Sequence, residues 1–170
     1  MLKVSTKQFK AESDVEPRKT KVLTEITLSN LKNDGELDEK DFLDRADILC
    51  AMGQTVVISN CDAYTKLIDY LADFKVNKTG LVVGARVLLD LINEKYYSHS
   101  DGSLLAAFGE LFRKNVKVYV YPIMQEGTAE LMTAKNLPIP DAITFLYRHL
   151  IDSQQITDLE GYDRKILHIF

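Results

Sequence analysis

The sequence predicts an α/β fold with three layers, in which helices cover a Rossmann-like, mostly parallel sheet of four or five strands with a hairpin at one edge. The first observation is a set of short apolar runs that each end at a polar residue or a glycine: Val22–Leu28, Thr55–Ile58, Leu81–Val83 and Val116–Tyr121. Strands buried on both faces have this character. The second observation is that helical spacing follows each of the first three runs, as in a parallel sheet. Ligands of such sheets bind at the carboxyl ends of the strands, which predicts where a site would lie.

Composition and charge limit the class of protein. A chain of 170 residues that is 46% hydrophobic and 27% charged fits one globular domain. The net charge of −4 and the pI near 5.4 argue against a nucleic-acid partner. No apolar run approaches the roughly 20 residues of a membrane span, and the first residues lack the apolar core of a signal peptide. Cys50 and Cys61 are isolated thiols, which favours a reducing cytoplasm, and no histidine or cysteine spacing indicates a metal site.

The first half of the chain divides into a polar arm and two strand–helix pairs. Residues 1–18 are expected as an arm leading into a single α/β domain over 19–170. A strand over 21–28 precedes a helix whose apolar face holds Phe42, Leu43, Ala46 and Leu49, with Cys50 beside it, and Asp38 is a candidate cap. Gly53 is expected to end this helix in a left-handed C-cap. A short strand over 55–59 then precedes a helix that carries Tyr64, Leu67, Ile68 and Leu71 on one face.

The second half repeats the pattern and adds a hairpin. A strand over 79–83 ends at Gly84, helices with apolar faces follow over 87–92 and 104–112, and a strand spans 117–121. Leu131–Thr133 is expected to return as a hairpin partner after a reversal at 125–127. Asp141 is a candidate cap for a last helix over 143–151. The tail 163–170 is amphipathic and ends on apolar residues, and we therefore expect the chain to be a piece of a longer protein.

Ser59 and Asn60 form the first candidate site, because they follow a strand and precede a helix. A hydroxyl, an amide and the amides of the helix would together bind a phosphate or carboxylate. The alternative is that Asn60 or Asp62 simply caps the helix.

Gly84 and Arg86 form the second candidate site. The glycine permits a close approach of a ligand to the backbone, and a cation in the first turn of a helix opposes the helix dipole unless an anion lies nearby. The alternative is a surface arginine paired with a carboxylate.

The loop 94–102 is the third candidate. His99 beside Asp101 would form an oriented general base, and Lys95 and Tyr97 would contact a phosphate or stack on a base. The alternative is that the tyrosines face the core and the histidine is solvated. Glu25 is a fourth position of interest, because a carboxylate inside a buried strand needs a partner or a raised pKa, unless it faces an edge.

Six short strings spread over most of the chain carry a family resemblance: Phe42–Arg45, Ile58–Asn60, Leu81–Gly84, Glu94–Tyr97, Ala107–Phe112 and Val118–Pro122. They are similar to the carboxy-terminal region of a bacterial and cyanobacterial family whose members are labelled nicotinate or nicotinamide mononucleotide adenylyltransferase, or TonB-dependent receptor. The resemblance implies a link to NAD metabolism and a missing amino-terminal region. The histidine cluster that a nucleotidyltransferase needs has no counterpart, because His99, His149 and His168 lie far apart in the sequence.

Two hypotheses for function follow. The first is a cytoplasmic module that binds a phosphorylated or nucleotide-like small molecule at Ser59, Asn60, Gly84 and Arg86, with Lys95 and Tyr97 contributing. The second is a structural or oligomerisation domain that contacts further copies or the amino-terminal region. No complete phosphate loop, dinucleotide fingerprint or serine-nucleophile elbow is present, so the sequence assigns neither a reaction nor a cofactor.

Overall fold

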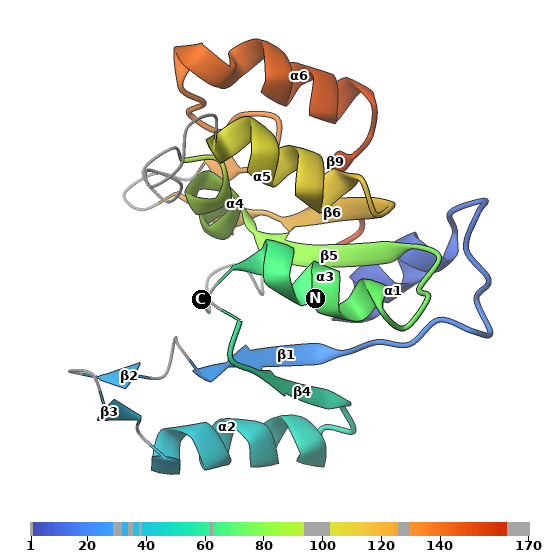
Figure 1. Cartoon of the computed structure of the whole chain (residues 1–170), viewed down its shortest axis with the longest axis vertical. Coiled ribbons are helices and arrows are strands. Elements are labelled where there is room, and N and C mark those ends of the chain that lie inside the picture. Colours follow the sequence, from blue (N-terminus) through green and yellow to red (C-terminus); the bar gives the residue numbers. More distant parts are fainter. Residues whose placement is uncertain are drawn as a thin grey trace. The chain divides into compact units, whose positions relative to one another are not determined.

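The structure, a computed structural model, describes residues 2–28, 32–33, 36–37, 39–61, 63–93, 103–125 and 130–162. It is a mixed α/β fold with parallel sheets, which confirms the predicted fold class (Figure 1). The chain forms two compact units. The smaller unit is Glu16–Lys75, and the larger unit combines Met1–Val15 with Val76–Phe170.

The smaller unit is built on two parallel strands, β1 (Thr24–Thr27) and β4 (Val56–Ser59), with Thr27 opposite Ser59. In the sequence, β1 and β4 are separated by an antiparallel pair of strands, β2 (Lys32–Asn33) and β3 (Glu36–Leu37), and by helix α2 (Glu39–Ala51). Gly53 has a φ of 74°, which confirms the predicted left-handed end of this helix. Helix α3 (Tyr64–Ala72) follows β4.

The larger unit contains a parallel sheet in the order β5–β6–β9, formed by β5 (Thr79–Gly84), β6 (Val116–Tyr121) and β9 (Ile156–Asp158). Helices α4 (Ala85–Leu91) and α5 (Ser103–Phe112) connect β5 to β6. A 3-10 turn, η3 (Asp141–Ile143), and helix α6 (Thr144–Asp152) precede β9. The predicted hairpin is confirmed, because β7 (Ile123–Met124) pairs with β8 (Leu131–Met132) in antiparallel fashion.

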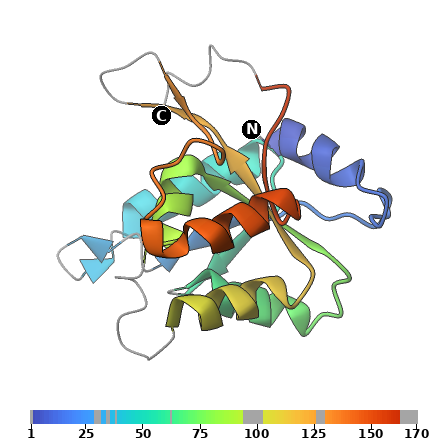
Figure 2. The ribbon, with the colours of Figure 1, turned by 90° about the horizontal axis from the view of Figure 1, so that it is seen from above.

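The core of the larger unit lies on both faces of β6. Tyr119 and Tyr121 on one face pack with Leu159 and with Phe9, which comes from helix α1 (Leu2–Lys10). The buried side chains of Val116, Val118 and Val120 alternate with these tyrosines and point to the other face. There α4 and α5 contact β6 and α6 contacts β9. Figure 2 shows α1, from the start of the chain, beside the segment that follows α6 near the other end.

Three features differ from the sequence predictions. The expected arm over 1–18 contains helix α1, and Phe9 of this helix is T-shaped against Tyr119 with ring centroids 6.1 Å apart. Strand β9 was not predicted, because only one of its three residues is a large apolar one. The parallel strands expected in one sheet lie in two, β1–β4 and β5–β6–β9, since apolar periodicity identifies strands but not their partners.

Two smaller expectations are wrong. Cys50 is exposed instead of lying on the buried side of its helix, and no residue of α2 is fully buried. Asp141 begins the turn η3 and does not cap α6, whose N-cap position is Ile143. None of the helices in the described ranges combines the length and the apolar character that a membrane crossing requires.

Candidate functional site

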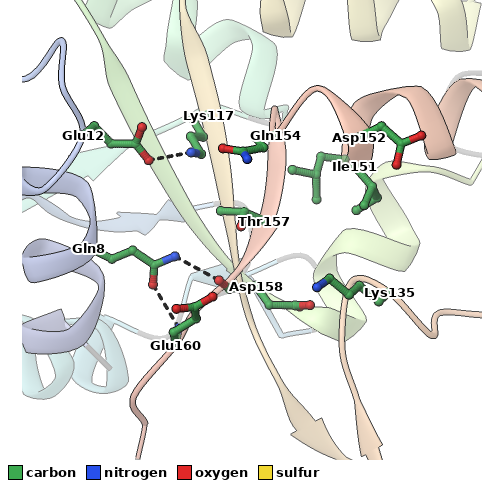
Figure 3. A pocket seen from close by; sticks show the side chains of 11 residues that line it. Gln8, Glu12, Lys117, Lys135, Ile151, Asp152, Gln154, Thr157, Asp158 and Glu160 are labelled. Atoms are coloured by element: carbon green, nitrogen blue, oxygen red, sulfur yellow. Dashed lines mark hydrogen bonds and ion pairs between the residues drawn. The ribbon is translucent and has the colours of Figure 1, made fainter.

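A polar cavity of about 490 Å³ opens in the larger unit beside β9 (Figure 3). Its walls come from α1 and the residues after it, from β6, from the end of α6 and from β9. Figure 3 shows Gln8 and Glu12 on one side of β9, and Asp152 and Lys135 on the other. The lining residues are Gln8, Glu12, Lys117, Lys135, Ile151, Asp152, Gln154, Ile156, Thr157, Asp158 and Glu160.

Asp158 stands at the carboxyl end of β9 and is partly buried. Its Oδ1 accepts a hydrogen bond of 2.6 Å from the Ala134 N–H, and the Tyr147 hydroxyl donates to the Ala134 carbonyl at 2.6 Å. Burial raises the pKa of Asp158 above its usual value. The Ala134 N–H and Lys135 lower the pKa in part, and the neighbouring Glu160 raises it further. The carboxylate is thus held in place by a peptide N–H but has lost much of its hydration.

Glu12 and Lys117 form the opposite wall as a closely paired cluster. The Lys117 ammonium donates to Glu12 Oε1 at 2.5 Å, the Tyr119 hydroxyl donates to the same oxygen at 2.9 Å, and Lys78 Nζ lies 3.6 Å from Glu12 Oε2. Burial alone would raise the pKa of Glu12, but the hydrogen bonds from Lys117 and Tyr119 and the charge of Lys78 outweigh it, and the pKa is lowered. Glu12 is therefore ionised, and the charge of Lys117 is already matched.

Gln8 joins α1 to the outer edge of β9. Its Nε2 donates to the Asp158 carbonyl at 3.0 Å, and the Glu160 N–H donates to its Oε1 at 2.9 Å (dashed in Figure 3). Both backbone groups face away from β6, because the intervening residue, Leu159, donates its N–H to the Val120 carbonyl at 2.9 Å. The side-chain amide therefore occupies a position that a neighbouring strand would otherwise use.

Sequence reasoning missed this site. The first signal is that Gln8 and Glu12 flank Phe9, a large apolar residue in a polar segment, which indicates packing of this segment against a core. The second signal is the run Ile156-Thr157-Asp158, in which two β-branched residues, typical of a strand, precede a carboxylate.

Ser59, a predicted ligand-binding residue, makes local contacts within the smaller unit. Its hydroxyl donates to Glu25 Oε1 at 2.5 Å and accepts the Cys61 N–H at 3.2 Å. Glu25 therefore has the partner that its place in the strand required. Asn60 is exposed and does not cap α3, because the N-cap position is Ala63, which makes no side-chain capping hydrogen bond. Asp62, the other candidate cap, lies outside the described residues.

Gly84 and Arg86 belong to the larger unit. Gly84 is the N-cap residue of α4, and a Cβ placed there would have no atom within 4 Å, so the backbone is open to a ligand. Arg86 is exposed in the first turn of α4. Lys95, Tyr97, His99 and Asp101 lie outside the described residues. Since Ser59 and Asn60 belong to the other unit, the meeting of these residues in one pocket stays a prediction.

The described ranges contain no group of three or more histidine, cysteine, aspartate or glutamate side chains that could hold a metal ion. Comparison of the chain with protein-family models, with curated proteins and with solved structures finds no match. The family resemblance of the six sequence strings therefore stays a prediction, and the site geometry carries the functional proposal.

Proposed function

We propose that the larger unit is a binding module that takes a positively charged group of its ligand in the cavity beside β9. The observation that carries the proposal is the charge of the lining. The cavity has four carboxylates, those of Glu12, Asp152, Asp158 and Glu160, and two lysines. Because Glu12 and Lys117 are bound to each other, the other three carboxylates are left with the single ammonium of Lys135 among the lining residues. An amine or guanidinium group beside Asp158 would replace the solvation that burial removes from this carboxylate.

The chemistry of the lining supports binding over covalent catalysis. Among the described residues that line the cavity, Thr157 supplies the one hydroxyl, and histidine and cysteine are missing. A nucleophile with an adjacent base is the usual signature of covalent catalysis, and such a pair does not line this cavity. A phosphate would meet the carboxylates of Asp152, Asp158 and Glu160, so a cationic ligand suits this cavity better than an anionic one.

Calorimetric titration with agmatine, spermidine and arginine amide tests the proposal, with the neutral analogue butanamide as the ligand control. At least one of the cations should bind, and Asp158→Asn should weaken it by about tenfold because the charge is lost while a hydrogen-bond acceptor remains. Asp141→Asn, an exposed carboxylate outside the cavity, is the matched control and should have no effect. Binding should also weaken as the pH falls, beginning above the usual aspartate pKa of 3.8, because protonation of Asp158 removes its charge.

Equal affinity of Asp158→Asn and the unaltered protein would refute the proposal. A parallel thermal-shift panel tests the phosphorylated-ligand hypothesis with nicotinate and nicotinamide mononucleotides, NAD, ATP and phosphate. A ligand at one hundred times its dissociation constant adds about 2.7 kcal/mol of stability, and Asn60→Ala or Arg86→Ala should abolish that shift. If the titrations detect no binding and the panel gives no thermal shift, the structural or oligomerisation domain becomes the better hypothesis.

A further inference from the structure

Strand β9 has one edge that no other described strand occupies. It is the last strand in the order β5–β6–β9, and β6 pairs with its inner edge. Val118 donates its N–H to the Gln155 carbonyl at 2.8 Å, and Leu159 donates its N–H to the Val120 carbonyl at 2.9 Å. Alternate residues of a strand direct their backbone groups to opposite edges, so those of Ile156, Asp158 and Glu160 face outward. An edge of this kind is a template for a further strand.

The Gln8 side chain shows how this edge bonds to a neighbour. One residue of a parallel strand donates its N–H to the carbonyl of a residue on the next strand and accepts the N–H of the residue two further on. Gln8 makes the same two contacts, to the Asp158 carbonyl and from the Glu160 N–H. Its amide thus stands in for one residue of an added strand, at the carboxyl end of β9. The cavity extends from there along Ile156 and Thr157.

We infer that the outer edge of β9 binds an extended, basic peptide segment as a fourth parallel strand of the β5–β6–β9 sheet, ending at Gln8. This rests on the proposed function, because it names the ligand that brings the positive charge into the same cavity. Such strand addition derives affinity from main-chain hydrogen bonds and specificity from alternate side chains.

The side chains around the edge define the sequence that would bind. Asp158 lies opposite Val120 in the register of the sheet, so its carboxylate is on the face that α6 covers, where Asp152 ends that helix. Successive side chains of an added strand alternate between the two faces. Lysine or arginine at every second position of the peptide would therefore meet Asp152 and Asp158, while the residues between them would lie toward Thr157 and α1.

The charge also argues against a second copy of this chain as the occupant. A second copy that paired through its own β9 edge would bring a second set of the same acidic side chains, Asp158 and Glu160, to this edge. Like charges gathered along a strand pair disfavour it. A basic peptide has the complementary charge.

The test uses the full chain and a fluorescein-labelled, end-capped peptide, Val-Lys-Val-Lys-Val, in anisotropy titrations. A second peptide with the same charges carries N-methyl groups on alternate backbone nitrogens, which removes the donors without changing the side chains. A third replaces lysine by glutamate. We expect the lysine peptide to bind, and each of the other two to bind at least about tenfold more weakly. Asp158→Asn and Asp152→Asn, the second at an exposed residue, should both weaken binding of the lysine peptide, and Asp141→Asn should not.

The outcomes separate strand addition from binding of a cation alone. If the N-methylated and unmethylated lysine peptides bind equally, strand addition is refuted and binding of a cation stands. If the lysine peptide fails to bind while agmatine or spermidine binds, strand addition is likewise refuted. If no cation of any kind binds, both proposals fail. A protein dimer in sedimentation velocity that excludes the lysine peptide would assign the edge to a second copy and overturn the choice of a basic peptide.

Discussion

Removal of the Glu12 carboxylate should destabilise the larger unit far more than removal of an exposed acid. Glu12 connects the segment after α1 to β6 by its contacts with Lys117 and Tyr119, and to the residue before β5 by its contact with Lys78. The two lysine side chains are only 11% and 12% exposed. Lys78 keeps its ion pair of 2.7 Å with Asp14, so Glu12→Ala would leave mainly the Lys117 ammonium with neither a partner carboxylate nor much access to water. Loss of one partner of a fully buried pair costs about 3–5 kcal/mol. The Glu12 side chain is 23% exposed, so in the variant water can partly replace the lost carboxylate. We therefore expect a loss of about 2 kcal/mol.

Urea unfolding followed by circular dichroism measures this loss. The matched control is Glu16→Ala, which breaks the pair of Glu16 and Lys19, whose side chains are 66% and 78% exposed. The control should lose less than about 1 kcal/mol. The folded-state pKa of Glu12 lies below its ordinary 4.5, so its contribution is complete above that pH and is lost as the pH falls through the folded-state pKa. The gap between the unaltered protein and Glu12→Ala should therefore close in acid. Equal losses for the two variants at neutral pH would refute the reasoning.

Two further predictions concern packing and titration in the larger unit. Gly80→Ala would place a Cβ 2.7 Å from the Phe9 ring and 3.2 Å from Tyr119, an overpacking that should cost about 1–3 kcal/mol in urea unfolding. The cost should fall in a Phe9→Ala background, and an unchanged cost there would contradict the proposed clash. Burial, together with the hydrogen bond to Glu12, raises the pKa of Tyr119, and burial also raises that of Tyr147. Stability should therefore hold up to about pH 10 and fall above it by at most about 1.4 kcal/mol per pH unit for each tyrosine, because only the unfolded chain ionises. Tyr147→Phe should reduce this slope in urea titrations, and an unchanged slope would refute the assignment.

The parts of the fold that local pattern determines could be predicted from the sequence. The apolar runs identified the strands β1, β4, β5 and β6, and the spacing of Leu67 and Ile68 identified α3. The turn chemistry of Gly53 and the return of Leu131 in a hairpin were confirmed as well. These features depend on neighbours a few residues apart, which a single sequence displays directly.

The candidate site depended on contacts that no local pattern records. Gln8 meets Asp158 across 150 residues, and Glu12 meets Lys117 across 105. Each of these polar residues looks like a solvated surface residue when only its neighbours are considered. The need of Glu25 for a partner could be predicted from its place in a strand, but Ser59 as that partner follows only from the register of β1 and β4.

The division of the chain sets the order in which its two units can fold during synthesis. The segment Met1–Val15 packs with Val76–Phe170, and the whole smaller unit, Glu16–Lys75, is made between them. A ribosome adds about 5–20 residues per second, so Gln8 waits roughly 8–30 s for the Asp158 backbone, 150 residues later, to be made. The smaller unit is continuous in the sequence and has no such delay. Until β6 and then β9 emerge from the ribosome, helix α1 therefore lacks the sheet on which it packs, and Phe9 is in contact with solvent or a chaperone.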